Sequence, residues 1–266
     1  MKKSDSLTLI GLILSSIVII IFITIQGNLI MFLNIKALLI TIIGSFSAML
    51  ITYSKEDIKN LKFLFKEFFK FEQSNKINII KKLIDIAKIS RKEGFLALDR
   101  ELYNIEDEFF KKSIQFVVDG MSLKEITDIL EAEIYNIDKR HKKFISMFKN
   151  WAVYAQVFGF VGTLIGIMSG VYNITDTNML TNSIEVSIVS TFYGLILAYL
   201  ILNPISLKLT NKNAEEIEIK KMILDAIVGI QDGITPAMLQ EKLYIYMSSR
   251  EKKEYLDVKK DEDINE

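Results

Sequence analysis

The chain has 266 residues, of which 50% are hydrophobic, and its 33 basic and 33 acidic side chains give a net charge of zero. A neutral chain is not expected to bind nucleic acid, because proteins that do so carry a strongly basic surface. The absence of cysteine excludes disulfides and thiolate metal sites.

Two apolar runs open the chain. The first, from Leu7 to Gln26, carries no charge, is too long for the hydrophobic region of a signal peptide and lacks a small-residue cleavage site. Gly27 and Asn28 allow a tight turn, after which a second run extends from Met31 to Tyr53. Each run has the length of about 20 residues that crosses a hydrocarbon core. We therefore predict that residues 1–53 form transmembrane helices 1 and 2.

Residues 54–150 form a predicted helical domain, because apolar and charged residues alternate at helical spacing without a proline. Its first part, residues 58–71, could continue the second span as one helix. A later helix is expected to end at Gly94, a plausible C-terminal cap, and a further helix to follow it. Ser122 and Glu125 have the spacing of a capping box, which predicts the start of another helix there.

The stretch from Trp151 to Lys208 is predicted to form transmembrane helices 3 and 4. It contains no basic residue before Lys208, and a short polar stretch separates its two long apolar runs. Small and hydroxyl-bearing residues recur on both runs at helical spacing, which lets helix backbones approach closely and is also typical of a narrow pore lining. Helix packing alone explains the glycines, whereas hydroxyls on both helices favour an ion path. The residues predicted to line it are Gly162, Thr163, Gly166, Ser187, Thr191 and Gly194.

Residues 209–266 are predicted to form C-terminal helices and a disordered tail. The helix that leaves the last span is expected to end at Gly233. Thr235 should then cap a short helix that opens with Pro236 at its first position. From Ser248 onwards the sequence is so polar that we expect disorder.

The distribution of basic residues orients the four predicted spans. Between Lys55 and Lys149 there are 20 Lys or Arg residues, whereas the short connections near Gly27 and Asp176 contain none. The positive-inside rule then places both termini and residues 54–150 in the cytoplasm. The predicted fold class is an all-α integral membrane protein, with four transmembrane helices and a helical cytoplasmic domain inserted between spans 2 and 3.

The residues that could carry chemistry exclude most enzyme classes. The chain has no G-x-x-x-x-G-K-[ST] motif, and its single histidine lies in a basic cytoplasmic cluster, so we predict no enzyme, metal site or cofactor. Proton paths through membranes normally need a buried carboxylate or histidine. The only acids of the hairpin are Asp176, in the loop, and Glu185, near the outer end of the last span. A second polypeptide would therefore have to donate the carboxylate. For Glu185, an interfacial position and a role at the path entrance are both open.

Four segments carry a resemblance to a known family: FGFVGTLIG at residues 158–166, STFYGLILAYLILNPISLKL at 190–209, IVGIQDGITPAMLQEKL at 227–243, and the cytoplasmic segment 90–120. Together with the four predicted spans, they make the chain resemble MotA, the larger subunit of the bacterial flagellar stator, over nearly its whole length. Energisers of the ExbB and TolQ type share the pattern of the last two spans but have three spans, so the extra N-terminal helix favours MotA.

The resemblance implies a homo-pentamer in the bacterial inner (cytoplasmic) membrane, arranged around a dimer of MotB. The MotB helices would bring the membrane aspartate that this chain lacks, and ion flow past it would drive rotation. The cytoplasmic domain would then push on the rotor protein FliG. The family's basic and acidic contact positions fall on Arg91 and Asp99, which lie at most two turns apart if one helix persists.

Two positions relate this chain to the family's prolines. Pro204 matches the proline of the last span, where it removes a backbone donor and kinks the helix. In the third span the family usually has Ala-Pro, whereas this chain has Gln156, which keeps its N–H and favours an unbroken helix.

The coupling ion, a proton or sodium, stays open. Within the family, a threonine at the position of Thr163 looks more like the sodium-type stators, but a hydroxyl can coordinate sodium or hold water for a proton. The alternative function is an ExbB- or TolQ-like energiser, or a membrane scaffold, without rotor contact. In a scaffold, the small-residue stripes would serve packing alone and the chain would pass no ions.

Overall fold

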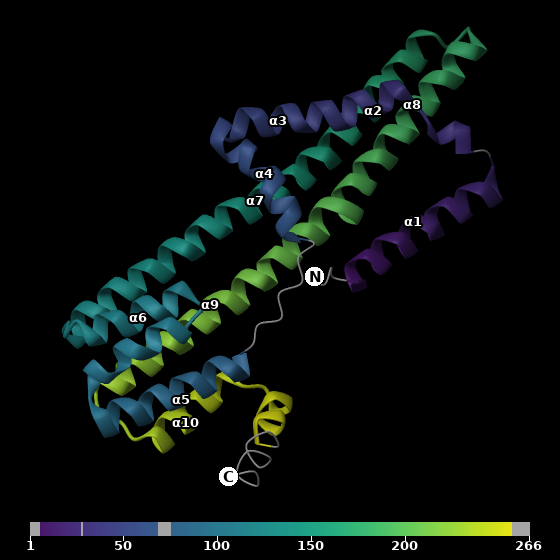
Figure 1. Cartoon of the computed structure of the whole chain (residues 1–266). Helices are drawn as coiled ribbons and strands as arrows, with labels where there is room; N and C mark the ends of the chain where they lie inside the picture. The colour runs from purple at the N-terminus through teal and green to yellow at the C-terminus, as the bar shows by residue number, and fades with distance from the viewer. Residues whose placement is uncertain (1–5, 28, 69–75, 257–266) are drawn as a thin grey trace. The chain divides into compact units, whose positions relative to one another are not determined.

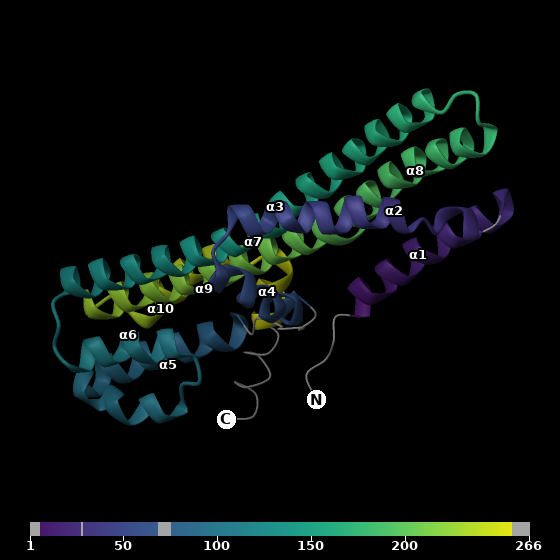
Figure 2. The same ribbon diagram turned by 90° about the horizontal axis from the view of Figure 1, so that it is seen from above.

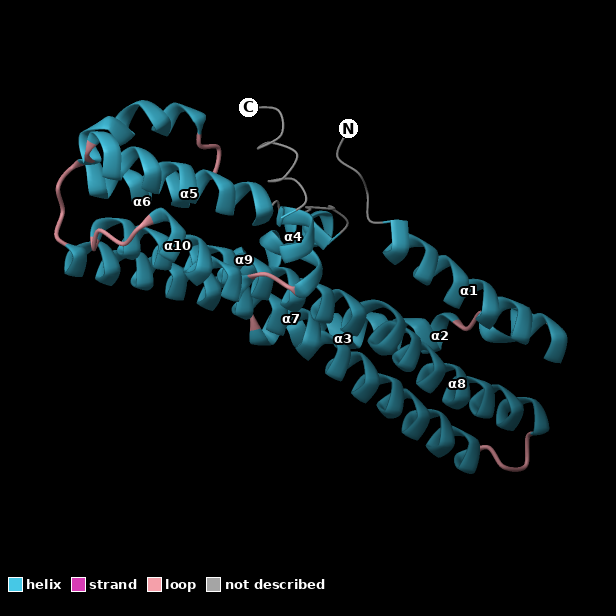
Figure 3. Ribbon diagram, turned by 90° about the horizontal axis from the view of Figure 1, so that it is seen from below, coloured by secondary structure: helices cyan, strands magenta, loops and turns pink. Residues whose placement is uncertain are grey.

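The computed structural model describes residues 6–27, 29–68 and 76–256, and every regular element in these ranges is helical (Figures 1 and 3). The all-α prediction is therefore confirmed for the described chain. The protein divides into two compact units, residues 1–72 with 141–211 and residues 73–140 with 212–266. Each unit is therefore formed by two stretches that are separated in the sequence.

The first unit contains the most apolar helices. Three helical stretches are long and apolar enough to cross a membrane: Leu29–Thr52, Leu123–Tyr172 and Thr177–Gln231. The N-terminal helix α1 (Ser6–Gln26) contains a shorter apolar stretch, Ile10–Ile25.

The second apolar run folds less regularly than the sequence predicts. It begins with the 3-10 turn η1 (Leu29–Phe32), and the helix proper starts only at Ile35, as α2 (Ile35–Leu38), a π-helical turn η2 (Leu39–Ile43) and α3 (Gly44–Thr52). The side chain of Asn34 caps α2 by accepting a hydrogen bond from the amide of Ala37, at 3.1 Å. The Asn34 cap therefore sets the start of this helix, in place of the predicted Met31.

The prediction that residues 58–71 continue the second span as one helix is wrong for the described residues up to 68. Tyr53 has an extended backbone, and a separate helix α4 (Lys55–Phe68) begins after Ser54. Ser54 and Asp57 form a capping box at this start, with a side-chain hydrogen bond of 2.7 Å. Lys143 Nζ donates to Asp57 at 2.7 Å, and hydrogen bonds from Lys143 and then Ser54 hold the pKa of Asp57 below its ordinary value.

Two long helices form the hairpin predicted after residue 150 (Figures 1 and 2). α7 (Leu123–Tyr172) is one uninterrupted helix of 50 residues. α8 (Thr177–Leu195) follows the loop, continues through a π-helical segment η4 (Ile196–Leu202) and passes into α9 (Asn203–Gln231). Met49, Phe148 and Leu202 are fully buried where α3, α7 and η4 pack together.

The second unit is built around a separate hydrophobic core. Its helices are α5 (Lys76–Glu93), the 3-10 helix η3 (Phe95–Asn104), α6 (Glu108–Val118), α10 (Pro236–Leu243) and the short turn η5 (Tyr244–Tyr246), together with the first part of α7 and the last part of α9. The side chains of Leu83, Leu98, Phe110, Ile126 and Leu239 are nearly or completely buried in this core.

Several helix ends of the second unit follow the predicted local signals. Gly94 and Gly233 have φ angles of 83° and 76°, which residues other than glycine rarely adopt, and each ends its helix. Ser122 Oγ donates to Glu125 at 2.7 Å while the Glu125 amide donates back at 3.3 Å, so the predicted capping box is confirmed. Thr235 caps α10, as predicted, by accepting from the Met238 amide.

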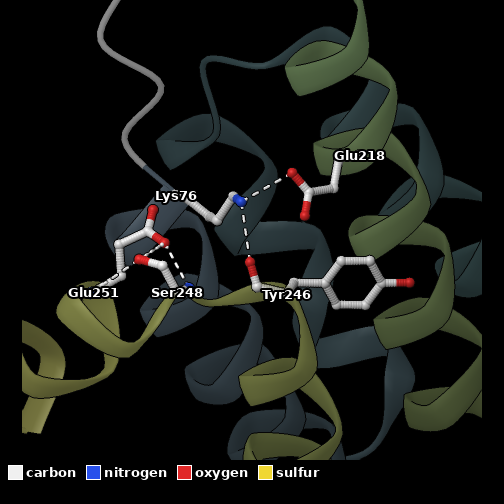
Figure 4. Close-up of polar contacts among 5 residues, drawn as sticks. All are labelled: Lys76, Glu218, Tyr246, Ser248 and Glu251. Atoms are coloured by element: carbon white, nitrogen blue, oxygen red, sulfur yellow. Dashed lines mark hydrogen bonds and ion pairs between the residues drawn. The ribbon is translucent and has the colours of Figure 1, made fainter.

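The prediction of disorder from Ser248 onwards is wrong for residues 249–256, which are helical, whereas residues 257–266 lie outside the described residues. Ser248 and Glu251 form another capping box, with bonds of 2.6 Å between side chains and 3.3 Å from the Glu251 amide (Figure 4). Tyr255 is buried and packs edge-on against the Tyr244 ring. The polar composition of this segment therefore did not indicate the buried ring of Tyr255 or the cap at Ser248.

The start of α5 is held beside this tail helix. Lys76 Nζ donates to Glu218 Oε2 at 3.1 Å and to the carbonyl oxygen of Tyr246 at 3.0 Å (Figure 4). Hydrogen bonds from Ser248 keep the pKa of Glu251 below its ordinary value, and the positive charge of Lys76 adds to this effect.

Candidate functional site

The two threonines predicted to line the ion path meet between α7 and α8. The hydroxyl of Thr163 is hydrogen-bonded to the hydroxyl of Thr191. It also lies 2.8 Å from the carbonyl oxygen of Ser187 and 3.2 Å from that of Gly159. Both side chains are partly exposed. The pair therefore presents hydroxyls and carbonyl oxygens at a single level of the hairpin.

The predicted glycines and Ser187 are buried directly between the two helices. A Cβ atom added at Gly194 would lie 2.7 Å from the carbonyl oxygen of Ala155, and one added at Gly166 would lie 2.7 Å from that of Ser183. One added at Gly162 would lie 2.5 Å from the side chain of Ser190. Since real Cβ atoms do not approach this closely, these positions require glycine for the backbones to pack.

The short helices α2 and α3, with the π-turn between them, cover one edge of the α7–α8 contact. The ring of Phe158 packs directly over Gly44, where an added Cβ would overlap it. Thr41 Oγ1 donates to the carbonyl oxygen of Ser190 at 3.3 Å, and Trp151 Nε1 donates to Ser45 Oγ at 3.2 Å. Because successive helical residues are turned by about 100°, Thr191 points away from the edge that the fully buried Ser190 faces.

Neither acid of the hairpin lies beside the threonine pair. Asp176 caps α8 by accepting from the amides of Asn178 and Met179, at 3.0 and 3.1 Å. Glu185 Oε1 accepts a hydrogen bond of 3.0 Å from Asn34 Nδ2, so its carboxylate faces the start of α2. Tyr193 reinforces this connection, because its hydroxyl donates to the carbonyl oxygen of Phe32. Glu185 therefore fastens the N-terminal segment to α8.

Pro204 and Gln156 lie on the two different helices of the hairpin, Gln156 on α7 and Pro204 on α9. Pro204 is the second residue of α9, two positions after the π-helical segment ends at Leu202, and the helix continues past it. Gln156 lies within α7, which is unbroken at this position as predicted. Its Oε1 accepts a hydrogen bond of 3.2 Å from the hydroxyl of Tyr199 in η4.

Arg91 and Asp99, the candidate rotor contacts, lie on different elements. Arg91 is in the last turn of α5 and Asp99 is on the 3-10 helix η3, with the positive-φ residue Gly94 between them. One helix therefore does not persist from Arg91 to Asp99. Both side chains are exposed and form no hydrogen bond or ion pair with another described residue. The neighbouring Arg100, in contrast, pairs with Glu93 at 2.7 Å.

Two contacts of the site were not predictable from local sequence. The bond between Asn34 and Glu185 joins residues 151 positions apart, and that between Gln156 and Tyr199 spans 43 positions. Polar residues inside apolar runs were the only signal for either contact, and they do not specify a partner.

Known proteins of one family are similar to this chain over most of its length. Residues 101–222 match the model of the MotA/TolQ/ExbB proton channel family. Motility protein A of Borreliella burgdorferi is 36% identical over 221 residues, which cover 83% of this chain and 85% of that protein. Motility protein A of Bacillus subtilis is 28% identical over 253 residues, covering 93% of each.

A solved structure is also similar. The flagellar MotAB stator complex from Bacillus subtilis contains a chain that matches with a TM-score of 0.85 and 27% identity, covering 92% of this chain and 98% of that one. The fold, the small-residue hairpin and the sequence identity over four fifths of the chain lead to one assignment. The chain belongs to the MotA/TolQ/ExbB proton channel family, and within it to the motility protein A group.

Proposed function

We propose that this chain is the MotA-type stator subunit of a bacterial flagellar motor, which with MotB converts a transmembrane ion gradient into rotation. The observation that carries the proposal is the paired hydroxyls of Thr163 and Thr191, set among backbone carbonyls in an apolar hairpin without its own mid-span carboxylate. A cation that crosses hydrocarbon needs oxygen ligands in place of its water, and a proton path normally also needs a carboxylate or histidine. The chain provides the ligands, and the partner provides the charge.

The proposal includes four spans in the bacterial inner membrane. The helix α1 is the first span, since the apolar run of the sequence from Leu7 to Gln26 has the required length. Residues 31–53, 151–172 and 177–208 supply the others, and both termini and the domain of residues 54–150 face the cytoplasm. The chain organisation is then 1–53 and 151–208 in the membrane, with 54–150 and 209–266 in the cytoplasm.

The ion passes between the hairpin and the MotB helix. The binding groups lie at the edge of the α7–α8 contact that α2 and α3 do not cover. They are the hydroxyls of Thr163 and Thr191 and the carbonyl oxygen of Ser187, and they hold the cation or its water near the partner's aspartate. Gly162, Gly166 and Gly194 act by bringing the two helices close enough for the hydroxyls to meet. Five copies surround the MotB dimer, and either a proton or sodium is the transported ion.

An ion-flux measurement tests this proposal. The chain is reconstituted with MotB, and uptake of protons and of sodium is followed in separate vesicle preparations. We expect flux from the complex and none from the chain alone, because the chain has no carboxylate at this level. Replacing Thr163 or Thr191 by valine should lower the flux about tenfold or more, since valine keeps the shape and removes one hydrogen-bonding group.

Two controls complete the test. Thr163→Ser should retain most of the flux, because it keeps the hydroxyl. Flux through the chain without any partner, or unchanged flux in both valine variants, would contradict the proposed path.

A further inference from the structure

We propose that Gln156 and Tyr199 form a second polar station of the ion path, on the cytoplasmic side of the threonine pair. This inference rests on the proposed function, because a station has meaning only in a chain that conducts ions. Its starting point is the 3.2 Å hydrogen bond from the Tyr199 hydroxyl to Gln156 Oε1, which joins α7 to η4 within the apolar hairpin.

On α7, Gln156 lies on the same edge as Thr163. The two residues are seven positions apart, which is nearly two full turns and brings the side chains within about 20° of each other around the helix axis. The same spacing separates them by about 10 Å along the axis. Gly159 and Gly162, which lie between them in sequence, are buried against α8. The polar residues therefore flank a tightly packed contact.

On the facing helix, Tyr199 is brought to this edge by the π-helical segment. Thr191 and Tyr199 are eight residues apart, which in an α-helix would turn their side chains about 80° from each other. Tyr199 lies within η4, where each residue turns through a smaller angle because more residues fill one turn. The wider winding moves Tyr199 toward the edge that carries Thr191, where it meets Gln156.

The pair has hydrogen-bonding capacity left over. Tyr199 is 57% exposed and Gln156 is also exposed, while neighbouring exposed positions of α7 are apolar, such as Val153, Val157 and Phe160. The bond to Tyr199 uses only the amide oxygen of Gln156, and no hydrogen bond from its Nε2 group to another described residue is present. An amide with free donors is costly against lipid, where water cannot pair with it. We therefore infer that the edge carrying Gln156 and Tyr199 is hydrated, as is the edge at the threonine pair.

The chemistry of the pair suits a cation with its water. The Gln156 carbonyl oxygen and the Tyr199 phenol oxygen are neutral ligands, which hold an ion loosely enough for it to leave. The amide donors of Gln156 orient the accompanying water. A sodium ion that leaves the partner's carboxylate would next bind at this station, about 10 Å farther along the helix axis. A proton would reach it through a chain of water molecules.

The test compares ion flux and assembly in the complex of the full chain with MotB. Gln156→Met keeps the length of the side chain and removes its polarity, and Tyr199→Phe removes one hydroxyl. We expect each to lower ion flux about tenfold at unchanged yield of purified complex. Gln156→Ser should recover part of the flux, because a hydroxyl and the water filling the vacated volume replace the amide. Val153→Leu, on the same exposed surface of α7, is the matched control and should leave flux unchanged.

The outcomes separate this inference from the function on which it rests. If the complex conducts and Thr163→Val blocks it, but Gln156→Met and Tyr199→Phe both conduct normally, the second station is wrong and the proposed function stands. A loss of flux that only mirrors a loss of assembled complex also overturns the station, since the pair would then serve packing. If the unaltered complex passes no ions, the proposed function itself fails.

Discussion

The hydroxyl of Thr163 has one proton and lies within hydrogen-bonding distance of three oxygen atoms, on Thr191, Ser187 and Gly159. It can donate to only one of them at a time, so the other oxygens keep lone pairs available. Such a group can redirect its proton when a cation or a water molecule arrives. At the scale of a residue, this surplus of acceptors gives the threonine pair the capacity to respond to an arriving ion.

Glycine substitutions test the close approach of α7 and α8. Gly194→Ala places a Cβ 2.7 Å from the carbonyl oxygen of Ala155, a backbone atom that cannot move aside. We expect the variant to lose about 1–3 kcal/mol of stability, as for other overpacked sites. Thermal unfolding of the purified chain in detergent measures this loss.

Gly11→Ala is the control for this measurement, because nothing lies within 4 Å of a Cβ added there. It should be neutral or slightly stabilising, since alanine is the better helix former. Equal stability of the Gly194 and Gly11 variants would show that the two helices do not pack as closely as described.

At the scale of an element, capping residues decide where the polar helices begin. The Ser-x-x-Asp/Glu pattern begins helices at Ser54, Ser122 and Ser248, each with reciprocal side-chain and backbone bonds. Of these three, only the box at Ser122 is predicted from the sequence. The pattern at Ser248 was overlooked because the surrounding composition is polar, and composition carries no information about a specific contact such as that of Tyr255 with Tyr244.

The Ser248 cap predicts a local loss of order. In Ser248→Ala, helix 249–256 loses the side-chain acceptor of its first turn, which typically costs about 1 kcal/mol. Hydrogen exchange of amides in this helix should become faster, with α7 and α9 unaffected. Ser249→Ala, one position along, is the control. Unchanged exchange in the Ser248 variant would contradict the cap.

The same cap predicts a pH dependence. Folding lowers the pKa of Glu251 from its ordinary value of 4.5, mainly through the Ser248 hydroxyl and then its amide. The carboxylate therefore stabilises the helix above pH 4.5, and this contribution is lost as the pH falls through the lower, folded-state pKa. Exchange in residues 249–256 should accelerate over this acidic range. In Ser248→Ala, the acceleration should be smaller.

The sequence predicts the helical elements well because their signals are local. Apolar runs, glycines and the Thr235–Pro236 pair each act within one or two turns, and they placed α1 and the start of α10 close to their actual positions. The prediction was poorer for α8, which begins at Thr177, within the polar stretch expected to separate the two apolar runs. The 3-10 helix after Gly94, the π-turns and the break at Tyr53 were missed. These features depend on packing against distant segments, which outweighs local preference.

The candidate site was predictable to the same extent. Thr163 and Thr191 could be chosen from composition, because hydroxyls are conspicuous in apolar runs, and the two do meet. Two other contacts depend on how neighbouring helices are rotated relative to each other. Glu185 turns toward Asn34, and Gln156 meets Tyr199. Sequence spacing fixes rotation within one helix but not between two, so these partners required the structure.

At the scale of the whole molecule, the proposed motor function requires a surface that acts on another protein. Arg91 and Asp99 are exposed, and neither is neutralised by a described neighbour. In Arg91→Glu and Asp99→Lys, we expect the complex to assemble with MotB and conduct ions normally but to generate less torque. Tethered-cell rotation and motility in soft agar, with ion flux measured in parallel, check this expectation.

Arg100 offers the matched control for these charge reversals. It is nearby and exposed, yet its charge is already paired with Glu93. Arg100→Gln should therefore change torque less than either reversal. Full motility in both Arg91→Glu and Asp99→Lys would favour an energiser or scaffold without rotor contact.

The length of α7 has a mechanical consequence. Its part in the first unit, residues 141–172, is a continuous helix of about 48 Å without a proline or a π-turn at which it could bend. Gln156 lies in this part of the helix, at the position where the resemblance described above led us to expect a proline. A joint would absorb part of any twist applied near Thr163, whereas an unjointed helix resists torsion along its whole length. In this chain, a turn imposed at Thr163 should reach Phe148, in the core of the same unit, almost undiminished.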